Sequence, residues 1–135
     1  MGSCLPKQQA ESSDVNAKLT GGNAHIITMT ESWKQKLAEA ESEERIVIAK
    51  LSASWCRPCR SISSFYAELA EKHPSLMFLS VDVDELTEFS TLWNIEATPT
   101  FFFLRNGQEM DRLVGANKDE LQKKINRVLI SQSKS

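Results

Sequence analysis

Two cysteines separated by two residues, Cys56 and Cys59, are the side chains of this sequence best suited to do chemistry. They follow the apolar run Ile46–Ala49 and precede a segment with helical periodicity, so the pair lies at a predicted strand-to-helix junction. In the first turn of a helix, this spacing brings both sulfurs to one side, where a disulfide can close. Unpaired backbone N–H groups and the positive end of the helix dipole favour the thiolate of Cys56, which is the attacking species in disulfide exchange. The sequence therefore predicts a dithiol that exchanges electrons with other thiols.

The segments around this pair alternate between strand and helix patterns. In chain order these are a β-prone stretch over 24–29, a helix after it, an apolar strand over 45–53, the helix opened by the cysteines, an apolar strand over 76–83 and a short helix over 86–93. Thr28 or Thr30 can cap the first helix. Pro58 is tolerated early in the second helix because its missing N–H would lack a partner, and that helix ends near Pro74. This order predicts parallel strands with helices on both faces.

The pattern changes after Pro99. A β run over 100–104, the hairpin signal Asn106-Gly107 and a second run over 109–114 predict antiparallel strands at one edge. A last amphipathic helix has its apolar positions at Leu121, Ile125, Val128 and Leu129. The predicted fold class is therefore α/β, with a central mixed sheet flanked by helices on both faces.

Length and composition indicate one domain. The 135 residues suit a single core over 23–131, with a flexible polar extension over 1–22 and a disordered tail over 132–135. A net charge of -2 without a run of Lys and Arg argues against nucleic-acid binding. No apolar stretch reaches the roughly 20 residues of a membrane span, and no signal peptide is evident. Three cysteines, two of them in the pair, do not suggest a disulfide-stapled secreted domain, which favours a reducing compartment.

Several motifs stand in an order that resembles thioredoxins. They are Trp55-Cys56-Arg57-Pro58-Cys59, Thr98-Pro99-Thr100, Asn106-Gly107 and Val114-Gly115-Ala116, and the resemblance covers about residues 24–130. The chain is most similar to plant h-type thioredoxins, especially the subgroup whose members begin Met-Gly-x-Cys and carry a polar extension. Segments 81–86 and 113–118 resemble that subgroup closely. The resemblance implies the thioredoxin fold and a protein-disulfide reductase.

Carried over residue by residue, the resemblance implies roles in disulfide reduction. Cys56 would attack a target disulfide, and Cys59 would resolve the mixed disulfide. Pro99 would be a cis-proline lying against the sulfurs, and the backbone of Thr98 would pair with the target's main chain. The rest of the contact surface for the target would be formed by Trp55, Pro58, Gly115 and Ala116. We expect no bound cofactor. The family's reductant is a flavin-containing thioredoxin reductase using NADPH, although some h-type members draw on glutathione and glutaredoxin.

Arg57 and Arg60 stand where most thioredoxins have Gly and Lys. A permanent cation beside Cys56 favours its thiolate, and stabilising the reduced form makes the disulfide a better oxidant. A one-unit fall in the thiol pKa corresponds to about 1.4 kcal/mol and roughly 30 mV, and solvent screening of Arg57 keeps the effect modest. Two alternatives to a reductase therefore stay open. One is a disulfide oxidase or isomerase favoured by Arg57, and the other is a tethered redox adaptor that binds partners through the cis-proline groove.

Lys50 occupies the position of a buried acid that assists proton transfer at the second cysteine of thioredoxins. Because side chains alternate along a strand, Lys50 shares a face with Ile46 and Ile48 and should be covered. Three interpretations stay open. A charged amine near Cys59 would stabilise the second thiolate, a neutral amine could act as the missing base, and an amine that reaches water would have no chemical role.

The first residues resemble an acylation signal. Gly2 and Cys4 would carry myristate and palmitate, the two anchors that stable membrane attachment needs, although Pro6 replaces the favoured Ser or Thr. Alternatively, Cys4 could pass electrons from a glutathione-linked donor to the active-site disulfide, or it could be an incidental thiol.

No metal site is expected. A metal held by Cys56 and Cys59 would need further ligands, and the chain offers Cys4, His25 and His73 far apart in the sequence. We expect disulfide-containing proteins as partners and a cytoplasmic monomer, attached to membranes at its periphery if the N-terminus is acylated.

Overall fold

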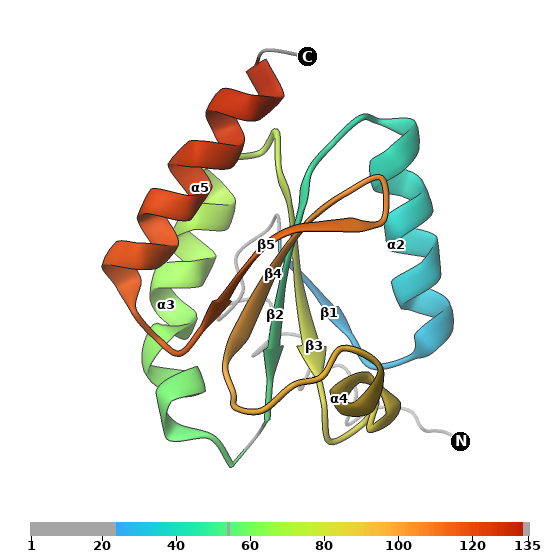
Figure 1. Cartoon of the computed structure of the whole chain (residues 1–135), viewed down its shortest axis with the longest axis vertical. Coiled ribbons are helices and arrows are strands. Elements are labelled where there is room, and N and C mark those ends of the chain that lie inside the picture. The colour runs from blue at the N-terminus through green and yellow to red at the C-terminus, as the bar shows by residue number, and fades with distance from the viewer. Residues whose placement is uncertain (1–23, 54, 134–135) are drawn as a thin grey trace, which may run out of the picture.

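A mixed sheet of five strands runs through the centre of the protein (Figure 1). The structure, a computed structural model, describes residues 24–53 and 55–133. The strands are β1 (Ala24–Ile27), β2 (Val47–Ser52), β3 (Met77–Asp82), β4 (Thr100–Arg105) and β5 (Gln108–Val114). They lie in the order β1-β3-β2-β4-β5, with β1, β3 and β2 parallel and β4 antiparallel to both of its neighbours. The predicted parallel strands and antiparallel edge are both present.

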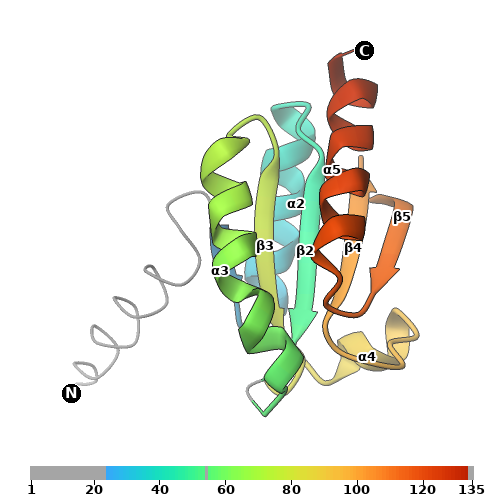
Figure 2. The same ribbon diagram turned by 90° about the vertical axis from the view of Figure 1, so that its left-hand side faces the viewer.

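Helices cover both faces of this sheet. Those that the structure describes are α2 (Thr30–Ser42), α3 (Arg57–Lys72), α4 (Glu88–Leu92) and α5 (Lys118–Ser133). Figures 1 and 2 show α3 and α5 side by side on one face and α2 on the opposite face. The arrangement confirms the predicted α/β class with a central mixed sheet flanked by helices.

The central strands bury side chains on both faces, which explains their nearly continuous apolar sequence. Along β4, Phe101 and Phe103 belong to the core beneath α3 and α5, whereas Phe102 belongs to the core beneath α2. The neighbouring β2 alternates in the same way, with Ile48 in the first core and Ala49 in the second. Burying one such large side chain stabilises the fold by roughly 1.5–3 kcal/mol, so these strands fix the frame on which the loops are held.

Helix α3 begins where the sequence predicts, at the cysteine pair. Cys56 is its N-cap residue, and Pro58 lies in the first turn, where the missing N–H removes no intrahelical hydrogen bond. The side chains that α3 buries against the sheet repeat at helical spacing and include Cys59, Ile62, Tyr66, Leu69 and Ala70. The pair is therefore attached to a helix that the core holds firmly.

Two predicted boundaries are wrong. The N-cap of α2 is Met29 without a side-chain cap, and Thr30 instead donates a hydrogen bond from Oγ1 to Glu88 Oε2 at 3.0 Å, a tertiary contact. The tail is predicted from residue 132, whereas α5 continues to Ser133 and the Gln132 amide donates to the Ser75 carbonyl at 3.1 Å. In both cases a partner distant in the sequence sets the local structure.

Some predictions concern residues that the structure does not describe. The extension over 1–22, with Gly2 and Cys4, lies outside the described residues, as do the last two residues, 134–135. Within 24–53 and 55–133, no helix combines the length and the apolar character that crossing a membrane requires.

Candidate active site

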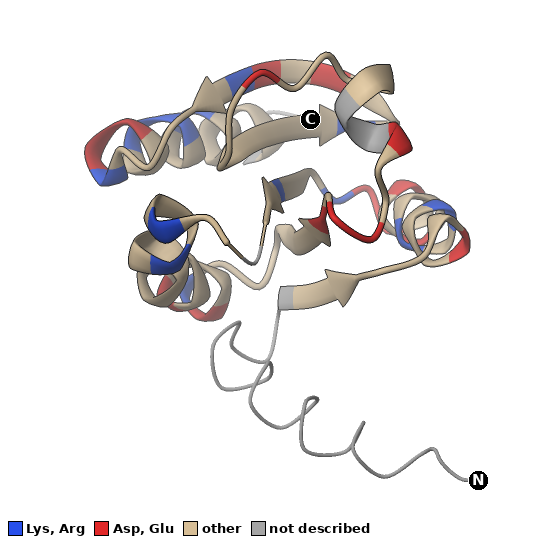
Figure 3. Cartoon of the chain, turned by 90° about the horizontal axis from the view of Figure 1, so that it is seen from below, with Lys and Arg blue, Asp and Glu red and all other residues tan. Residues whose placement is uncertain are grey.

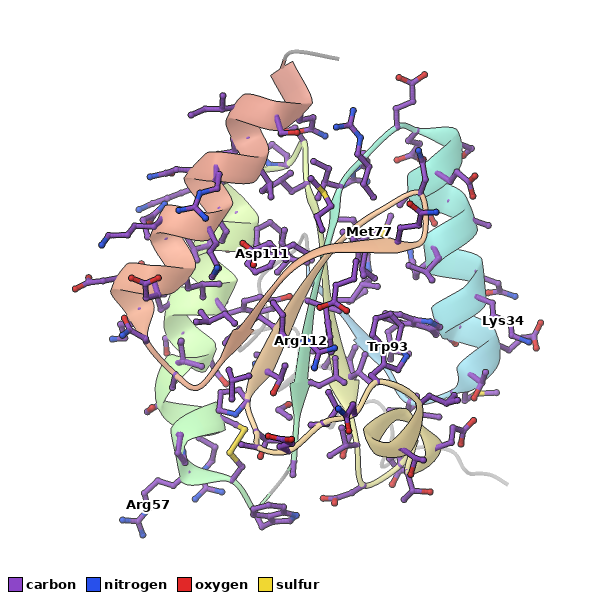
Figure 4. All side chains as sticks on the ribbon, in the orientation of Figure 1. Lys34, Arg57, Met77, Trp93, Asp111 and Arg112 are labelled. Atoms are coloured by element: carbon purple, nitrogen blue, oxygen red, sulfur yellow. A yellow bond between two sulfur atoms is a disulfide. The ribbon has the colours of Figure 1, made fainter. Side chains whose placement is uncertain are left out.

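The two cysteines form a disulfide at the start of α3 (Figure 4). Their Cα atoms are 5.3 Å apart, and each side chain is 3% exposed. The Cys59 N–H donates to the Cys56 sulfur at 3.2 Å. A backbone donor at a helix N-terminus stabilises negative charge, so this sulfur sits where the thiolate is favoured once the disulfide is reduced.

A second segment, distant in the sequence, lies against the disulfide. The Thr98–Pro99 peptide bond is cis, as predicted, and the Thr98 carbonyl oxygen lies 3.5 Å from the Cys56 sulfur. The Gly115 N–H donates to the Pro99 carbonyl at 2.8 Å, and Gly115 has a φ of 104°, which L side chains rarely adopt. Neighbouring Ala116 packs against the core beneath α3 and α5. The structure thus brings three separate segments of the predicted contact surface together.

Trp55 presents an apolar surface next to the disulfide. Its side chain is 71% exposed, and its indole Nε1 donates to Asp84 Oδ1 at 3.3 Å. Asp82 supports the same loop, because its Oδ1 accepts the Asp84 N–H at 2.8 Å. Sequence reasoning missed this contact. The available signal is that Asp82 ends β3 and Asp84 follows it, at the sheet edge where the cysteine loop follows β2.

The charged side chains near the disulfide fall into two groups. Figure 3 shows Lys and Arg on the first turns of α3 and acidic residues on the segment that joins β3 to α4. Arg57 is exposed, and Figure 4 shows its side chain extending away from the body of the protein. Its charge is therefore surrounded by water, which weakens its effect on the Cys56 thiolate.

Lys50 is buried on the face of β2 that α3 covers. Its side chain is 5% exposed, its Nζ donates to Ser63 Oγ at 3.4 Å, and the same nitrogen lies 5.0 Å from the ring centroid of Tyr66. Desolvation by burial lowers the pKa of Lys50 from 10.5 to about 8. The amine thus turns inward toward α3, and the interpretation in which it reaches water is wrong.

Tyr66 lies beside Lys50 and is itself hydrogen-bonded to the sheet. Its hydroxyl lies 2.9 Å from the Ile48 carbonyl and 2.7 Å from the Leu79 carbonyl, so its single proton is shared between β2 and β3. Burial raises the pKa of Tyr66 well above 10.0, and the phenol is neutral. The sequence predicts a helix here, but it carries no signal for these hydrogen bonds.

No metal-binding group is found among residues 24–53 and 55–133, where no three His, Cys, Asp or Glu side chains gather. His25 lies in β1 and His73 at the C-cap of α3, and burial is the main cause that lowers the pKa of each. Neither histidine contributes to the disulfide's surroundings.

Comparison with known proteins identifies the family that shares this fold. The family model for thioredoxin matches residues 24–127. Thioredoxin H9 of Arabidopsis thaliana is 55% identical over 136 residues, which covers 100% of this chain and 97% of that relative. A Thioredoxin H-type of Populus jackii is 56% identical over 133 residues, covering 97% of this chain and 96% of the relative. The crystal structure of a poplar wild-type thioredoxin h is 60% identical, with a TM-score of 0.79 over 80% of this chain and 97% of that one.

These relatives decide between the functions that the sequence left open. The matched region includes the disulfide, the cis-proline segment and the frame that holds them. Neither the oxidase or isomerase reading nor the adaptor reading is favoured by relatives that are thioredoxins themselves. The chain belongs to the thioredoxin family, its homologues include plant h-type thioredoxins, and it is a thiol–disulfide oxidoreductase that reduces protein disulfides.

Proposed function

We propose that Cys56 is the attacking residue and Cys59 the resolving residue of the reductase. The Cys56 thiolate attacks one sulfur of a target disulfide, and the other target sulfur leaves as a thiolate. The Cys59 thiolate then attacks the Cys56 sulfur, and the second target thiolate leaves as the Cys56–Cys59 disulfide forms. Two electrons pass to the target, which takes up two protons. The supporting observation is the position of the Cys56 sulfur, between the Cys59 N–H and the Thr98 carbonyl.

The target would bind as an extended peptide beside the cis-proline. Thr98 is partly exposed and lies two residues before the buried start of β4, so its backbone can pair with an added strand. The exposed Trp55 ring and Pro58 would contact the target on the side of α3. Gly115 and Ala116 would contact it on the side of β5.

Trapping experiments test these roles. A Cys59→Ser variant should accumulate a mixed disulfide with insulin on Cys56, because nothing displaces the bound target. A Cys56→Ser variant should form no such adduct and should not reduce insulin with any donor. Retention of insulin reduction by Cys56→Ser would assign the attack to another thiol and overturn the proposal.

A thioredoxin reductase supplies electrons to members of this family. We propose that an NADPH-dependent thioredoxin reductase reduces this protein, and the alternative donor is glutathione with glutaredoxin. We also propose that the chain is cytoplasmic, belongs to the subgroup beginning Met-Gly-x-Cys, and is acylated on Gly2 and Cys4. The support for acylation is the N-terminal sequence alone.

A Cys4→Ser variant distinguishes the two roles of the Cys4 thiol, membrane anchor and electron carrier. Release from membranes with unchanged turnover supports the anchor, whereas loss of turnover with glutaredoxin alone supports electron transfer through Cys4.

A further inference from the structure

Lys50 is a buried cation that the exchange steps described above do not use. It lies on β2 opposite Ser80 of β3 and Phe101 of β4, and α3 covers the same face. Its side chain is 5% exposed, so the amine is almost entirely removed from water. A lysine is rarely buried to this extent unless its charge interacts with something nearby.

A short chain of hydrogen bonds joins this amine to the resolving cysteine. Lys50 Nζ donates to Ser63 Oγ at 3.4 Å, and the Ser63 hydroxyl donates to the backbone carbonyl of Cys59 at 2.9 Å. Because the Ser63 proton is used on that carbonyl, its oxygen lone pairs are directed to the amine. Ser63 therefore links the Lys50 amine to the backbone of Cys59 in the first turn of α3.

The other groups around the amine suit an ammonium but do not neutralise it. The Tyr66 ring lies 5.0 Å away and its phenol is neutral, and the Ser80 hydroxyl is buried without a hydrogen-bond partner among the described residues. Asp82, farther along the same face of β3, accepts the Asp84 N–H. Desolvation lowers the pKa of Lys50 to about 8 with no opposing carboxylate among its causes. A group with a pKa of about 8 is mostly protonated at neutral pH.

We propose that Lys50 is a positioning residue for the second step, in which its ammonium, held by Ser63, stabilises the thiolate of Cys59. The proposal rests on the role of Cys59 given above. The Cys59 thiol releases its proton to solvent, and its thiolate attacks the Cys56 sulfur as the bond from Cys56 to the target breaks. Lys50 exchanges no electrons and forms no covalent bond, and its charge raises the fraction of Cys59 that is ready to attack.

The acidity of Cys59 tests the proposal directly. In a Cys4→Ser/Cys56→Ser background Cys59 is the only thiol, and its ionisation is followed by the ultraviolet absorbance of the thiolate. Lys50→Met should raise the Cys59 pKa by about one unit, which is a tenfold smaller thiolate fraction at neutral pH. Lys72→Met, at the exposed far end of α3, is the matched control and should leave it unchanged. A Cys59 pKa that is equal or lower in Lys50→Met would overturn the proposal.

The kinetics of the complete protein give a second readout. With Cys56 and Cys59 intact, resolution of a mixed disulfide should slow about tenfold in Lys50→Met at neutral pH, and the difference should disappear above the Cys59 pKa. Ser63→Ala, which keeps the charge but removes its hydrogen bond, should slow resolution less. Failure of Cys59→Ser to trap a target would refute the proposed function itself, whereas trapping together with an unchanged resolution rate in Lys50→Met refutes this inference alone.

Discussion

At the scale of single residues, charges near the disulfide differ in whether protein or water surrounds them. The Cys59 N–H reaches the Cys56 sulfur at 3.2 Å inside a site where both cysteines are 3% exposed. Arg57 is next to Cys56 in sequence but its side chain extends into solvent (Figure 4). Lys50 is distant in sequence and buried. Interactions in a low-dielectric interior are stronger than those across water, so burial matters more than adjacency.

Arg57→Gly is therefore expected to change the redox properties only slightly. Loss of the exposed cation should make the reduction potential more negative by at most about 30 mV, and added salt should shrink the difference. Equilibration of the Cys56–Cys59 couple with glutathione buffers measures this. A shift several times larger would mean that Arg57 contacts the thiolate directly and would revive the oxidase or isomerase reading.

Lys50 should leave a signature in the pH dependence of stability. Its pKa falls from 10.5 unfolded to about 8 folded, so between these values the unfolded chain binds more protons. The free energy of unfolding should rise with pH through this window, relative to a Lys50→Met variant, by on the order of 3 kcal/mol. Urea unfolding at several pH values measures the difference, and Lys72→Met should follow the wild type. Curves for wild type and Lys50→Met that stay parallel would contradict burial of the charge.

At the scale of elements, α3 performs two tasks at its two ends. Its first turn presents the cysteines, and its later turns are held to β2 and β3 by the Tyr66 hydroxyl and by the apolar side chains around it. Tyr66 also stacks edge-on against Phe78, with ring centroids 5.4 Å apart. The position of the disulfide thus depends on contacts one or more turns away from it.

Tyr66→Phe isolates the hydrogen-bonding part of this attachment. The ring stays, but the Ile48 and Leu79 carbonyls lose their shared donor, so the free energy of unfolding should fall by about 1–3 kcal/mol. Ser64→Ala on the exposed side of α3 is the control, expected within about 0.5 kcal/mol of wild type. Denaturant unfolding measures the free energy of unfolding of each variant. Equal values for Tyr66→Phe and wild type would show that packing alone holds the helix.

At the scale of the whole molecule, the core beneath α2 is separate from the residues that carry the chemistry. Lys50 and Tyr66 lie on the side of α3 and α5, while Phe102, Trp93 and Trp33 pack together on the side of α2. Cys56 and Cys59 form a third, smaller cluster with Ala53. Phe102 also lies 4.4 Å from the Arg112 guanidinium. Neither cysteine belongs to the core beneath α2, although Val83 packs against both that core and the cysteine cluster.

Phe102→Ala should therefore weaken the fold without changing the chemistry. Removing a side chain that is 1% exposed should lower the free energy of unfolding by about 3–5 kcal/mol. Insulin reduction, measured well below the melting temperature of the variant, should stay close to that of the wild type. A loss of turnover while the protein is still folded would show that the two cores are coupled.

The sequence by itself determined the parts whose cause is local. The Cys-x-x-Cys pair at a strand-to-helix junction predicted where α3 begins, because the start of a helix depends on neighbouring residues. Asn106-Gly107 predicted the hairpin, and both residues have the positive φ values, 53° and 78°, that such a turn requires. Apolar runs predicted strands covered on both faces, because a continuous apolar run is itself a local feature of the sequence.

Only the tertiary structure decided the contacts between distant segments. It placed the Thr98 carbonyl against the Cys56 sulfur, joined Lys50 to Cys59 through Ser63, and tied Trp55 to Asp84. It also moved the start of α2 and the end of α5 away from their predicted boundaries. Periodicity specifies which face of an element is buried, but not which residue of another element meets it. That choice follows from strand order and register, and these are set by the packing of the complete sheet.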